Sequence, residues 1–247
     1  MFLQLENAQE VHFNPADFKG LQRPSDSIST VQPPFVPIIA VMGGVGSGKS
    51  SIIRYVASQI SAVVIDADQI GHHVLTRPDI HTVLRREFGN QIFDDRGAID
   101  RRALGKLVFG DDPQTSMRKK QLEKIVHPLI KREIQAQIAA ARQPMPAGKL
   151  PEVILLDAAV ILEAGWRSIC DSLVFLDTPT ELRRQRVQQQ RGWSDENWRM
   201  REASQFSLEK KRELADFIVD NSTTLEEAGL QLQQIIRQVR ESAGRHM

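Results

Sequence analysis

Short apolar runs alternate with longer segments of helical periodicity from Pro37 onward. Each run is only a few residues long and is uninterrupted by charge, which is typical of strands that are buried on both faces of a parallel sheet. The predicted strands are Ile38–Met42, Ala62–Ile65, Val153–Leu156, Leu173–Leu176 and Phe217–Val219. This alternation predicts an α/β fold built around a parallel sheet.

One long region lacks any convincing strand. Between Asp68 and the breaker-rich loop Gln143–Lys149, apolar positions recur at helical spacing. The clearest helical segments are Val83–Phe88, Ala103–Phe109 and Leu129–Ile134. We therefore interpret residues 69–149 as a helical insertion between two strands of the sheet.

The two parts of the predicted core are residues 37–68 and 150–235. Residues 1–36 combine weak periodicity with breaker-rich stretches, so we expect them to form an N-terminal extension. Residues 236–247 are expected to form a C-terminal tail.

The segment Gly43–Ser51 carries the strongest chemical signal. Its sequence GGVGSGKSS contains the phosphate-binding pattern G-x-x-x-x-G-K-[ST], placed between a predicted strand and a predicted helix. Glycines let the backbone N–H groups turn inward, and the N-terminus of the helix favours bound anions. The alternative is a Gly-Ser turn before an ordinary helix, but such a turn would not need every residue of this pattern. The motif predicts that Lys49 contacts the β- and γ-phosphates and that Ser50 binds Mg²⁺.

Two carboxylates follow the second predicted strand, at Asp66 and Asp68. A kinase that phosphorylates a hydroxyl group needs one carboxylate to orient and deprotonate the nucleophile, and another near the metal. Either residue could alternatively cap the helix that follows. Because these carboxylates follow a P-loop in the sequence, a role in catalysis or metal binding is favoured over capping alone.

Six arginines lie between Arg183 and Arg201, on two helical patterns separated by Gly192-Trp193-Ser194. A hinged, arginine-rich segment suits a lid that closes on phosphates, and we assign this role to residues 183–205. A solvated helix face is the alternative for any single arginine.

Net charge, cysteine content and the lengths of the apolar runs indicate the partners and the cellular compartment to expect. The formal net charge of +1 gives no general attraction to nucleic acid or to an anionic membrane. Cys170 is the single cysteine, so no internal disulfide forms, and we expect it to be a buried structural thiol. No apolar run approaches the roughly 20 residues of a membrane span, and no secretory signal pattern is present. We expect a cytoplasmic protein.

In combination, these motifs resemble those of the dephospho-CoA kinase family, from Ile38 to about Asn221. The resemblance rests on these segments in one order: GGVGSGKS, VIDADQI (Val64–Ile70), IDRRALGKLVF (Ile99–Phe109), His127–Ile130, DAAVILEAGW (Asp157–Trp166), Leu176–Pro179 and ADFIVDN (Ala215–Asn221). The family has a P-loop kinase fold with a five-stranded parallel sheet, a helical substrate-binding domain and a lid. It uses Mg²⁺ and ATP to phosphorylate the ribose 3′-hydroxyl of dephospho-CoA.

The resemblance also implies roles for individual residues. Asp68 matches the catalytic aspartate, and Arg186, Arg201 and Gln205 match the lid. Of these three, Arg186 and Arg201 would close over the phosphates. The nucleotide would be held by Gly44, Val45, Gly46, Ser47, Gly48, Lys49, Ser50 and Ser51, with Asp216 and Asn221 near its base. The acceptor side would be lined by Asp66, Arg101, His127, Asp157 and Glu163.

This chain departs from the family pattern near the acceptor and in the lid, and more mildly at Ser51, where the family usually has threonine. Ala159 stands where the family usually has a proline, which removes a backbone constraint near the acceptor. In the lid, Gln189-Gln190-Arg191 replaces the usual Lys-Arg-Asp and shifts one arginine by a position. These departures keep open a P-loop kinase that acts on another small metabolite. A nucleotide-dependent switch or a binding protein without activity is less favoured, because Lys49, Ser50 and Asp68 are all present.

Overall fold

A computed structural model describes residues 35–110, 112–144 and 148–245. Five strands are present within these residues: β1 (Ile38–Gly43), β2 (Ala62–Asp66), β3 (Val153–Asp157), β4 (Ser172–Asp177) and β5 (Phe217–Asp220). All five predicted strands are confirmed, because each observed strand differs from its predicted bounds by at most one residue at either end. The predicted extension, residues 1–36, lies outside the described residues except for Phe35 and Val36.

The sheet is wholly parallel, in the order β2-β3-β1-β4-β5. The central strand β1 pairs with β3 on one side and with β4 on the other, so the loop after β1 opens between the ends of those two strands. In the register, Asp157 of β3 lies opposite both Val41 of β1 and Asp66 of β2. Ligands in open α/β sheets bind at this carboxyl edge, near the point where the strand order reverses.

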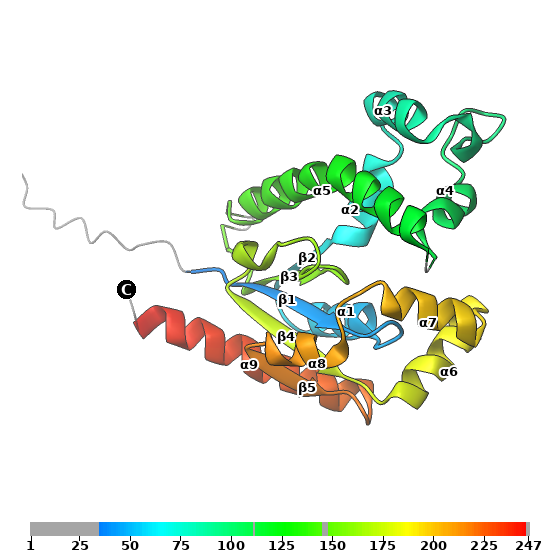
Figure 1. The fold of residues 1–247 in the computed structure, drawn as a ribbon. Coiled ribbons are helices and arrows are strands. Elements are labelled where there is room, and N and C mark those ends of the chain that lie inside the picture. Colours follow the sequence, from blue (N-terminus) through cyan, green and yellow to red (C-terminus); the bar gives the residue numbers. More distant parts are fainter. Residues whose placement is uncertain (1–34, 111, 145–147, 246–247) are drawn as a thin grey trace, which may run out of the picture. The chain divides into compact units, whose positions relative to one another are not determined.

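Helices cover both faces of the sheet and extend beyond its carboxyl edge (Figure 1). They are α1 (Lys49–Gln59), α2 (Ala67–Val74), α3 (Pro78–Phe88), α4 (Arg101–Val108), α5 (Pro113–Ala141), α6 (Thr180–Arg191), α7 (Asp195–Ala203), α8 (Leu208–Glu213) and α9 (Leu225–Arg245), with short 3-10 turns at η2 (Asn90–Ile92) and η3 (Arg167–Ile169). The insertion therefore contains α2 to α5. Its described residues include no strand, only an isolated bridge between Phe93 and Ile99.

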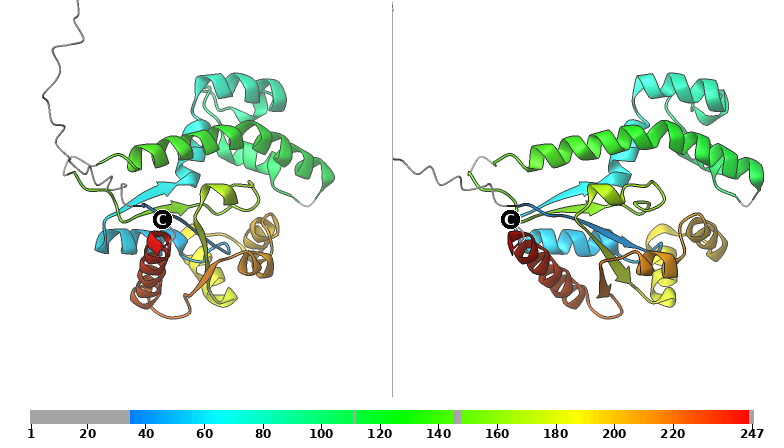
Figure 2. Two further views of the ribbon diagram at one scale, coloured as in Figure 1. Left: turned by 90° about the vertical axis from the view of Figure 1, so that its left-hand side faces the viewer. Right: turned by 60° about the vertical axis from the view of Figure 1, so that its left-hand side comes forward.

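Alternate residues of the strands face two separate cores. Ile39 and Val41 of β1 point to a core formed with α1 and α9, whereas Ala40 and Met42 point to a core formed with the insertion. Both views of Figure 2 place α5 on one side of the sheet and α1 with α9 on the other. Burial on both faces explains the continuous apolar runs of β1, β3 and β4, whereas the edge strands β2 and β5 leave Val64 and Ile218 exposed.

The last helix is longer than the sequence analysis predicted. α9 continues to Arg245, and its residue Ile236 is almost fully buried in the core. The predicted tail, residues 236–247, is therefore corrected: through Arg245 it is the continuation of α9. The physical reason is the amphipathic spacing of Leu232, Ile236 and Val239, which carries the buried stripe past the predicted boundary.

No helix in the described part of the chain is both long enough and apolar enough to cross a membrane.

Candidate active site

The P-loop runs from the end of β1 to the first turn of α1 and depends on glycine at two positions. Gly46 and Gly48 have φ angles of 83° and 87°, in the left-handed region that favours glycine. A Cβ atom on Gly46 would lie 2.5 Å from the carbonyl oxygen of Arg183. The loop therefore packs against α6 without room for a side chain. A cavity of about 400 Å³ opens over the loop, lined by its residues Gly46–Ser51 and by Arg186, Arg191 and Asn221.

The backbone of the loop is fixed through the carbonyl oxygen of Ser47, which is a buried residue. It accepts hydrogen bonds from Thr178 Oγ1 at 3.1 Å, from Arg186 Nη1 at 3.1 Å and from Asn221 Nδ2 at 2.7 Å. These donors hold the carbonyl in place from three different segments. Asn221, predicted to bind the nucleotide, thus lies at the cavity and supports the loop.

A hydroxyl group and a carboxylate meet next to the loop. Ser50 Oγ donates a short hydrogen bond to Asp157 Oδ2, and Asp66 lies opposite Asp157 in the sheet register. Hydroxyl and carboxylate oxygens are ligands that suit Mg²⁺, which usually completes its shell with water and substrate phosphates. The described residues contain no group of three or more His, Cys, Asp or Glu side chains arranged for a metal. The Ser50 hydroxyl and the Asp157 carboxylate fit an ion whose other ligands are phosphate and water oxygens.

Asp66 and Asp68 have different surroundings. Asp66 is the N-cap of α2, where its Oδ1 accepts a hydrogen bond from the N–H of Gln69 at 2.8 Å. Asp68 sits in the first turn of the helix and has no such role. The capping interpretation thus holds for Asp66, and the carboxylate of Asp68 stays available.

The pKa of Asp68 is raised above its usual value. Part of the residue is open to solvent, but burial of the carboxyl group is the largest cause. The ammonium group of Lys49 lowers this pKa, and the carboxylates of Asp157 and Asp66 raise it. The structure therefore brings Asp68, Lys49 and Asp157 within electrostatic range of one another.

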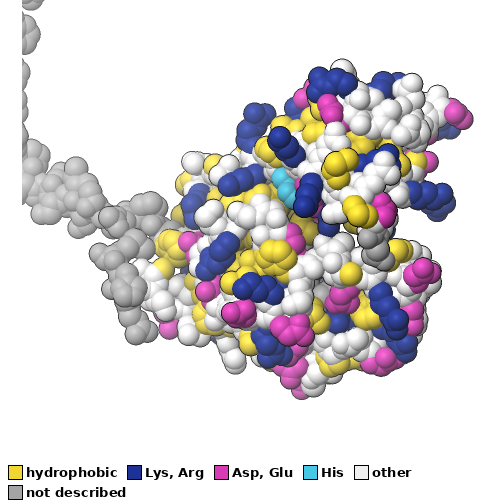
Figure 3. Space-filling model, in the orientation of Figure 1, with side chains coloured by type: hydrophobic (Ala, Val, Ile, Leu, Met, Phe, Trp, Pro, Cys, Tyr) yellow, Lys and Arg dark blue, Asp and Glu magenta, His cyan; other side chains and the backbone are white. Residues whose placement is uncertain are grey.

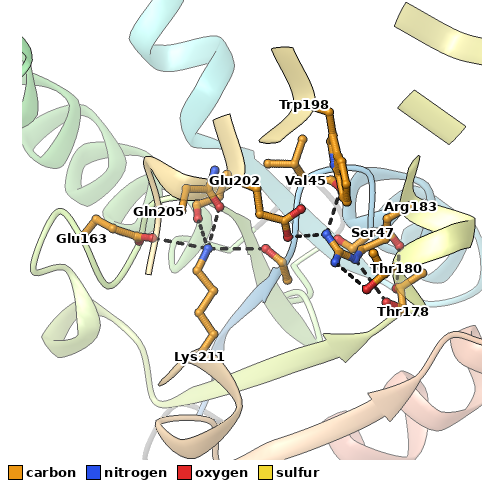
Figure 4. A network of polar contacts seen from close by, with 12 residues as sticks. Val45, Ser47, Glu163, Thr178, Thr180, Arg183, Trp198, Glu202, Gln205 and Lys211 are labelled. Carbon is orange, nitrogen blue, oxygen red and sulfur yellow. Dashed lines mark hydrogen bonds and ion pairs between the residues drawn. The ribbon is translucent and has the colours of Figure 1, made fainter. Parts of the chain in front are cut away.

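Arg183 joins the P-loop to the predicted lid, as Figure 4 shows. Its side chain is 2% exposed and donates to the carbonyl oxygens of Thr178 and Val45, and it forms an ion pair with Glu202 of α7. Trp198 Nε1 donates to the same Val45 carbonyl at 3.2 Å. Arg183 was predicted only as one of several lid arginines, and the structure makes it a buried link between α6, α7 and the loop.

Lys211 of α8 forms a second buried link, also in Figure 4. Its side chain is 1% exposed, and its Nζ lies 2.7 Å from Gln205 Oε1, 3.3 Å from the Ala159 carbonyl and 3.4 Å from Glu163 Oε1. It also donates to the carbonyl oxygen of Gly43. Burial lowers the pKa of Lys211, while the carboxylate of Glu163 raises it. Sequence reasoning missed Lys211, because its neighbour Lys210 and the acidic residues around it are typical of a solvated helix.

Glu163 was predicted to line the acceptor side. Its Oε1 accepts from the N–H of Phe206 at 2.7 Å and pairs with Lys211, whereas its buried Oε2 has no hydrogen-bond partner among the described residues. Gln205 was predicted as a lid residue. Its side-chain oxygen accepts a hydrogen bond from Lys211 Nζ, and no hydrogen bond from its side chain to the P-loop is present among the described residues. Both residues therefore connect the segment after α7 with the loop after β3.

The predicted lid arginines lie in two places. Arg186 donates to the Ser47 carbonyl, beside Gly48 of the P-loop. Arg201 instead packs near the aromatic rings of Phe109 and Trp193, and burial and the charges of Arg191 and Arg101 lower its pKa. Arg101, at the start of α4, donates to His72 Nε2 at 2.6 Å. Arg101 of the insertion and Arg201 of the lid thus lie within electrostatic range of each other.

His127 lies away from the P-loop. α5 continues through Pro128, and the ring of His127 packs edge-on against Trp166 with 5.4 Å between centroids. The two residues line a separate cavity of about 500 Å³ with Lys120, Glu123, Lys124, Pro128, Lys131 and Ala164. Burial lowers the pKa of His127. Figure 3 shows the face on which α5 lies, where Lys and Arg side chains are interspersed with apolar ones.

Two further predictions have opposite outcomes. Cys170 is buried as predicted, and burial raises the pKa of its thiol to about 12. Asp216 was predicted to lie near the nucleotide base. It lies before β5 at the amino edge of the sheet, where it accepts from Leu173 N at 2.7 Å and pairs with Arg167. That prediction is wrong, because Asp216 precedes β5 whereas Asn221 follows it, so the two residues lie at opposite ends of the strand.

Comparison with known proteins identifies relatives that span most of the chain. The model of the dephospho-CoA kinase family matches residues 37–227. The dephospho-CoA kinase of Corynebacterium diphtheriae is 37% identical over 188 residues, which are 75% of this chain and 88% of that protein. The dephospho-CoA kinase of Clostridium tetani is 36% identical over 203 residues, covering 81% and 84% of the two chains. A crystal structure of TT1252 from Thermus thermophilus matches with a TM-score of 0.67 at 29% identity, covering 83% of this chain and 98% of that one.

Proposed function

Because this chain belongs to the dephospho-CoA kinase family, we propose that it transfers the γ-phosphoryl group of ATP to the ribose 3′-hydroxyl of dephospho-CoA, giving coenzyme A and ADP. The observation that carries the proposal is the approach of three groups at one edge of the sheet. They are Lys49 of the P-loop, the Ser50–Asp157 pair and the unengaged carboxylate of Asp68. Donor, metal and acceptor chemistry would meet there.

On the donor side, the P-loop N–H groups and the N-terminus of α1 would hold the β- and γ-phosphates. Lys49 would neutralise charge on the same phosphates, and Arg186 would add a second cation beside Gly48. Phosphoryl transfer depends mainly on such positioning and charge neutralisation. Gly44, Val45, Gly46, Ser47, Gly48 and Ser51 would supply the rest of the loop.

The Ser50–Asp157 pair is the proposed position of Mg²⁺. When bound there, the ion would be held by the Ser50 hydroxyl and the Asp157 carboxylate and would supply positive charge against the negative charge that develops during transfer. Asp157 would act here, beside Ser50, rather than on the acceptor. Asp66, which caps α2, would hold that helix in position.

Asp68 is the proposed general base. Its pKa is raised above that of an ordinary aspartate, chiefly by burial, and a base whose pKa lies nearer to the working pH accepts a proton more readily. It would accept the proton of the acceptor hydroxyl and orient that oxygen for attack in line with the leaving group. A well-placed base of this kind contributes about 10²- to 10⁴-fold to the rate.

The insertion is the proposed acceptor-binding part, and residues 183–205 are the proposed lid. Arg101 and Arg201 would meet acceptor and phosphate charge where the two parts approach each other. His127 would act in the cavity beside Trp166, and Glu163 would shape the loop after β3 through Lys211. Closure of such a lid would exclude water and limit wasteful hydrolysis.

The test is ADP release from Mg²⁺ and ATP with dephospho-CoA, AMP, gluconate or water as the acceptor, with Lys49→Ala as the blank. Turnover with dephospho-CoA well above the other acceptors supports the proposal. Turnover with another acceptor alone would show that the protein is a kinase but that dephospho-CoA is not its substrate. Equal ADP release with and without an acceptor would favour a nucleotide-dependent switch.

A further inference from the structure

One tryptophan at the bend of the lid is shared by two arginines. Trp193 lies between Gly192, which ends α6 in the left-handed conformation, and Ser194, which caps α7. The centroid of its ring is 4.9 Å from the guanidinium carbon of Arg191 and 4.2 Å from that of Arg201. Both distances are within the range of a cation–π contact. One aromatic ring thus holds the last arginine of α6 and an arginine of α7.

The same contacts continue into the insertion. The guanidinium carbon of Arg201 is 5.0 Å from the centroid of Phe109, which follows α4 and is 37% exposed. The positive charges of Arg191 and Arg101 both act on Arg201. We call Arg101, Arg191, Arg201, Trp193 and Phe109 the arginine–tryptophan cluster. Arg201, which lies over both rings, joins the lid to the insertion.

The charges in this cluster differ from those elsewhere in the lid. Arg183 pairs with Glu202, and Arg184 pairs with Glu181 and Asp195. Within the described part of the chain, Arg101, Arg191 and Arg201 form no ion pair with a carboxylate. Like charges held close together repel each other, and aromatic faces offset only part of that cost. Such a site gains most from an anion with several oxygen atoms, which guanidinium groups can bind in pairs.

The position of the cluster indicates which anion it takes. The donor phosphates already have the P-loop N–H groups, Lys49 and Arg186. Arg101 and Phe109 instead belong to the insertion, and neither of them lines the P-loop cavity. Arg191 lines the P-loop cavity, so the cluster begins where the donor site ends. An anionic group of the acceptor would therefore reach it.

We propose that Trp193 is a positioning residue that holds Arg191 and Arg201 as one clamp, completed by Arg101, and that this clamp binds the diphosphate group of the acceptor. The proposal rests on the proposed function, since it names how the same site selects its acceptor. A nucleoside without the diphosphate would not engage the clamp. Trp193 would set acceptor affinity without touching the reacting atoms.

The first experiment compares steady-state kinetics of Trp193→Leu with those of the unaltered protein. Loss of the cation–π contacts is expected to raise KM for dephospho-CoA about 3- to 30-fold, while KM for ATP and kcat stay within about twofold. Phe109→Leu should change the same constant in the same direction. Arg237→Gln removes one charge from an exposed position of α9, outside the lid and the cluster, and is the matched control. An unchanged KM for dephospho-CoA, or an equal rise in both KM values, would overturn the proposal.

The second experiment measures binding without turnover. Inorganic diphosphate is titrated in the presence of saturating ADP, which occupies the P-loop, and tryptophan emission is recorded. The account predicts a saturable change in emission that Trp193→Phe abolishes and that Arg237→Gln retains. A change that persists in Trp193→Phe, or no saturable change in the unaltered protein, would contradict the clamp. A protein that binds diphosphate in this way but does not phosphorylate dephospho-CoA would retain the clamp and refute the proposed function.

Discussion

Ser50 of α1 donates a hydrogen bond to Asp157 at the end of β3, across 107 positions of sequence. The contact fixes the first turn of the helix after the P-loop against the carboxyl edge of the sheet. It also places a hydroxyl and a carboxylate oxygen together at the point where the phosphates of a nucleotide would lie. Four predictions follow from the contacts around this edge.

Ser50→Ala should raise the Mg²⁺ concentration that gives half-maximal activity, because it removes one of the two oxygen ligands. Asp157→Asn should act in the same direction by weakening the charge at the same position. The measurement is activity as a function of Mg²⁺ at saturating ATP. Ser58→Ala, whose hydroxyl donates to the Tyr55 carbonyl at the far end of α1, serves as the control. An identical Mg²⁺ dependence for all four proteins would contradict this assignment.

Asp68→Asn should lower kcat by about 10²- to 10⁴-fold and remove the acid limb of the pH profile. The unaltered protein should lose activity as the pH falls through the pKa of Asp68, which is raised by burial and by Asp157 and Asp66. The same shift means that ionised Asp68 opposes folding once the pH rises above its usual pKa, so the neutral variant should be at least as stable at pH 7.

The check on Asp68→Asn is a pH–kcat profile together with thermal unfolding at pH 7. Asp95→Asn makes the same charge change at an exposed position of the insertion and should leave both unchanged. An acid limb that survives in Asp68→Asn would show that another group is titrating.

Lys211→Met should lower the free energy of unfolding by about 3–5 kcal/mol, because it leaves the mostly buried carboxylate of Glu163 without its cation. The double variant Lys211→Met with Glu163→Gln should recover part of that loss, since no unpaired charge remains. Denaturant unfolding of Lys211→Met, of Glu163→Gln and of the double variant measures both effects. Additive losses in the double variant would mean that the two side chains are not coupled.

Gly46→Ala should weaken ATP binding and destabilise the fold, whereas Gly97→Ala should cost only backbone strain. Both glycines have positive φ, at 83° and 79°, so that strain is shared. Only Gly46 would bring its Cβ to 2.5 Å from a backbone oxygen, while nothing lies within 4 Å of a Cβ on Gly97. The comparison of KM for ATP and unfolding free energy in the two variants isolates the contact with α6. Equal effects in both would show that close packing against Arg183 is unimportant.

Sequence reasoning succeeded where the signal was local. The strands were predicted because burial on both faces leaves continuous apolar runs, and the P-loop because its spacing is fixed by phosphate geometry. The resemblance to the dephospho-CoA kinase family, which rested on motifs in one order, is confirmed by the match over residues 37–227. The fold inferred from it is confirmed as well.

The remaining site features depend on contacts between distant segments. Lys211 meets Gly43, Ala159 and Glu163, none of which is near it in sequence, so a charged residue in a charged helix gave no sign of burial. Arg183 likewise differs from its neighbour Arg184 only through its contacts with Val45 and Glu202. The choice between Asp66 and Asp68 as cap required the hydrogen bond to Gln69 N.

The central claim is tested most directly by the product itself. The protein is incubated with Mg²⁺, ATP and dephospho-CoA, and the phosphorylated product is isolated and its new phosphate located by NMR. The account predicts a single ester at the ribose 3′-oxygen, formed in equal amount with ADP and absent with Lys49→Ala. ADP that accumulates without any phosphorylated acceptor, or a phosphate at another position, would contradict it.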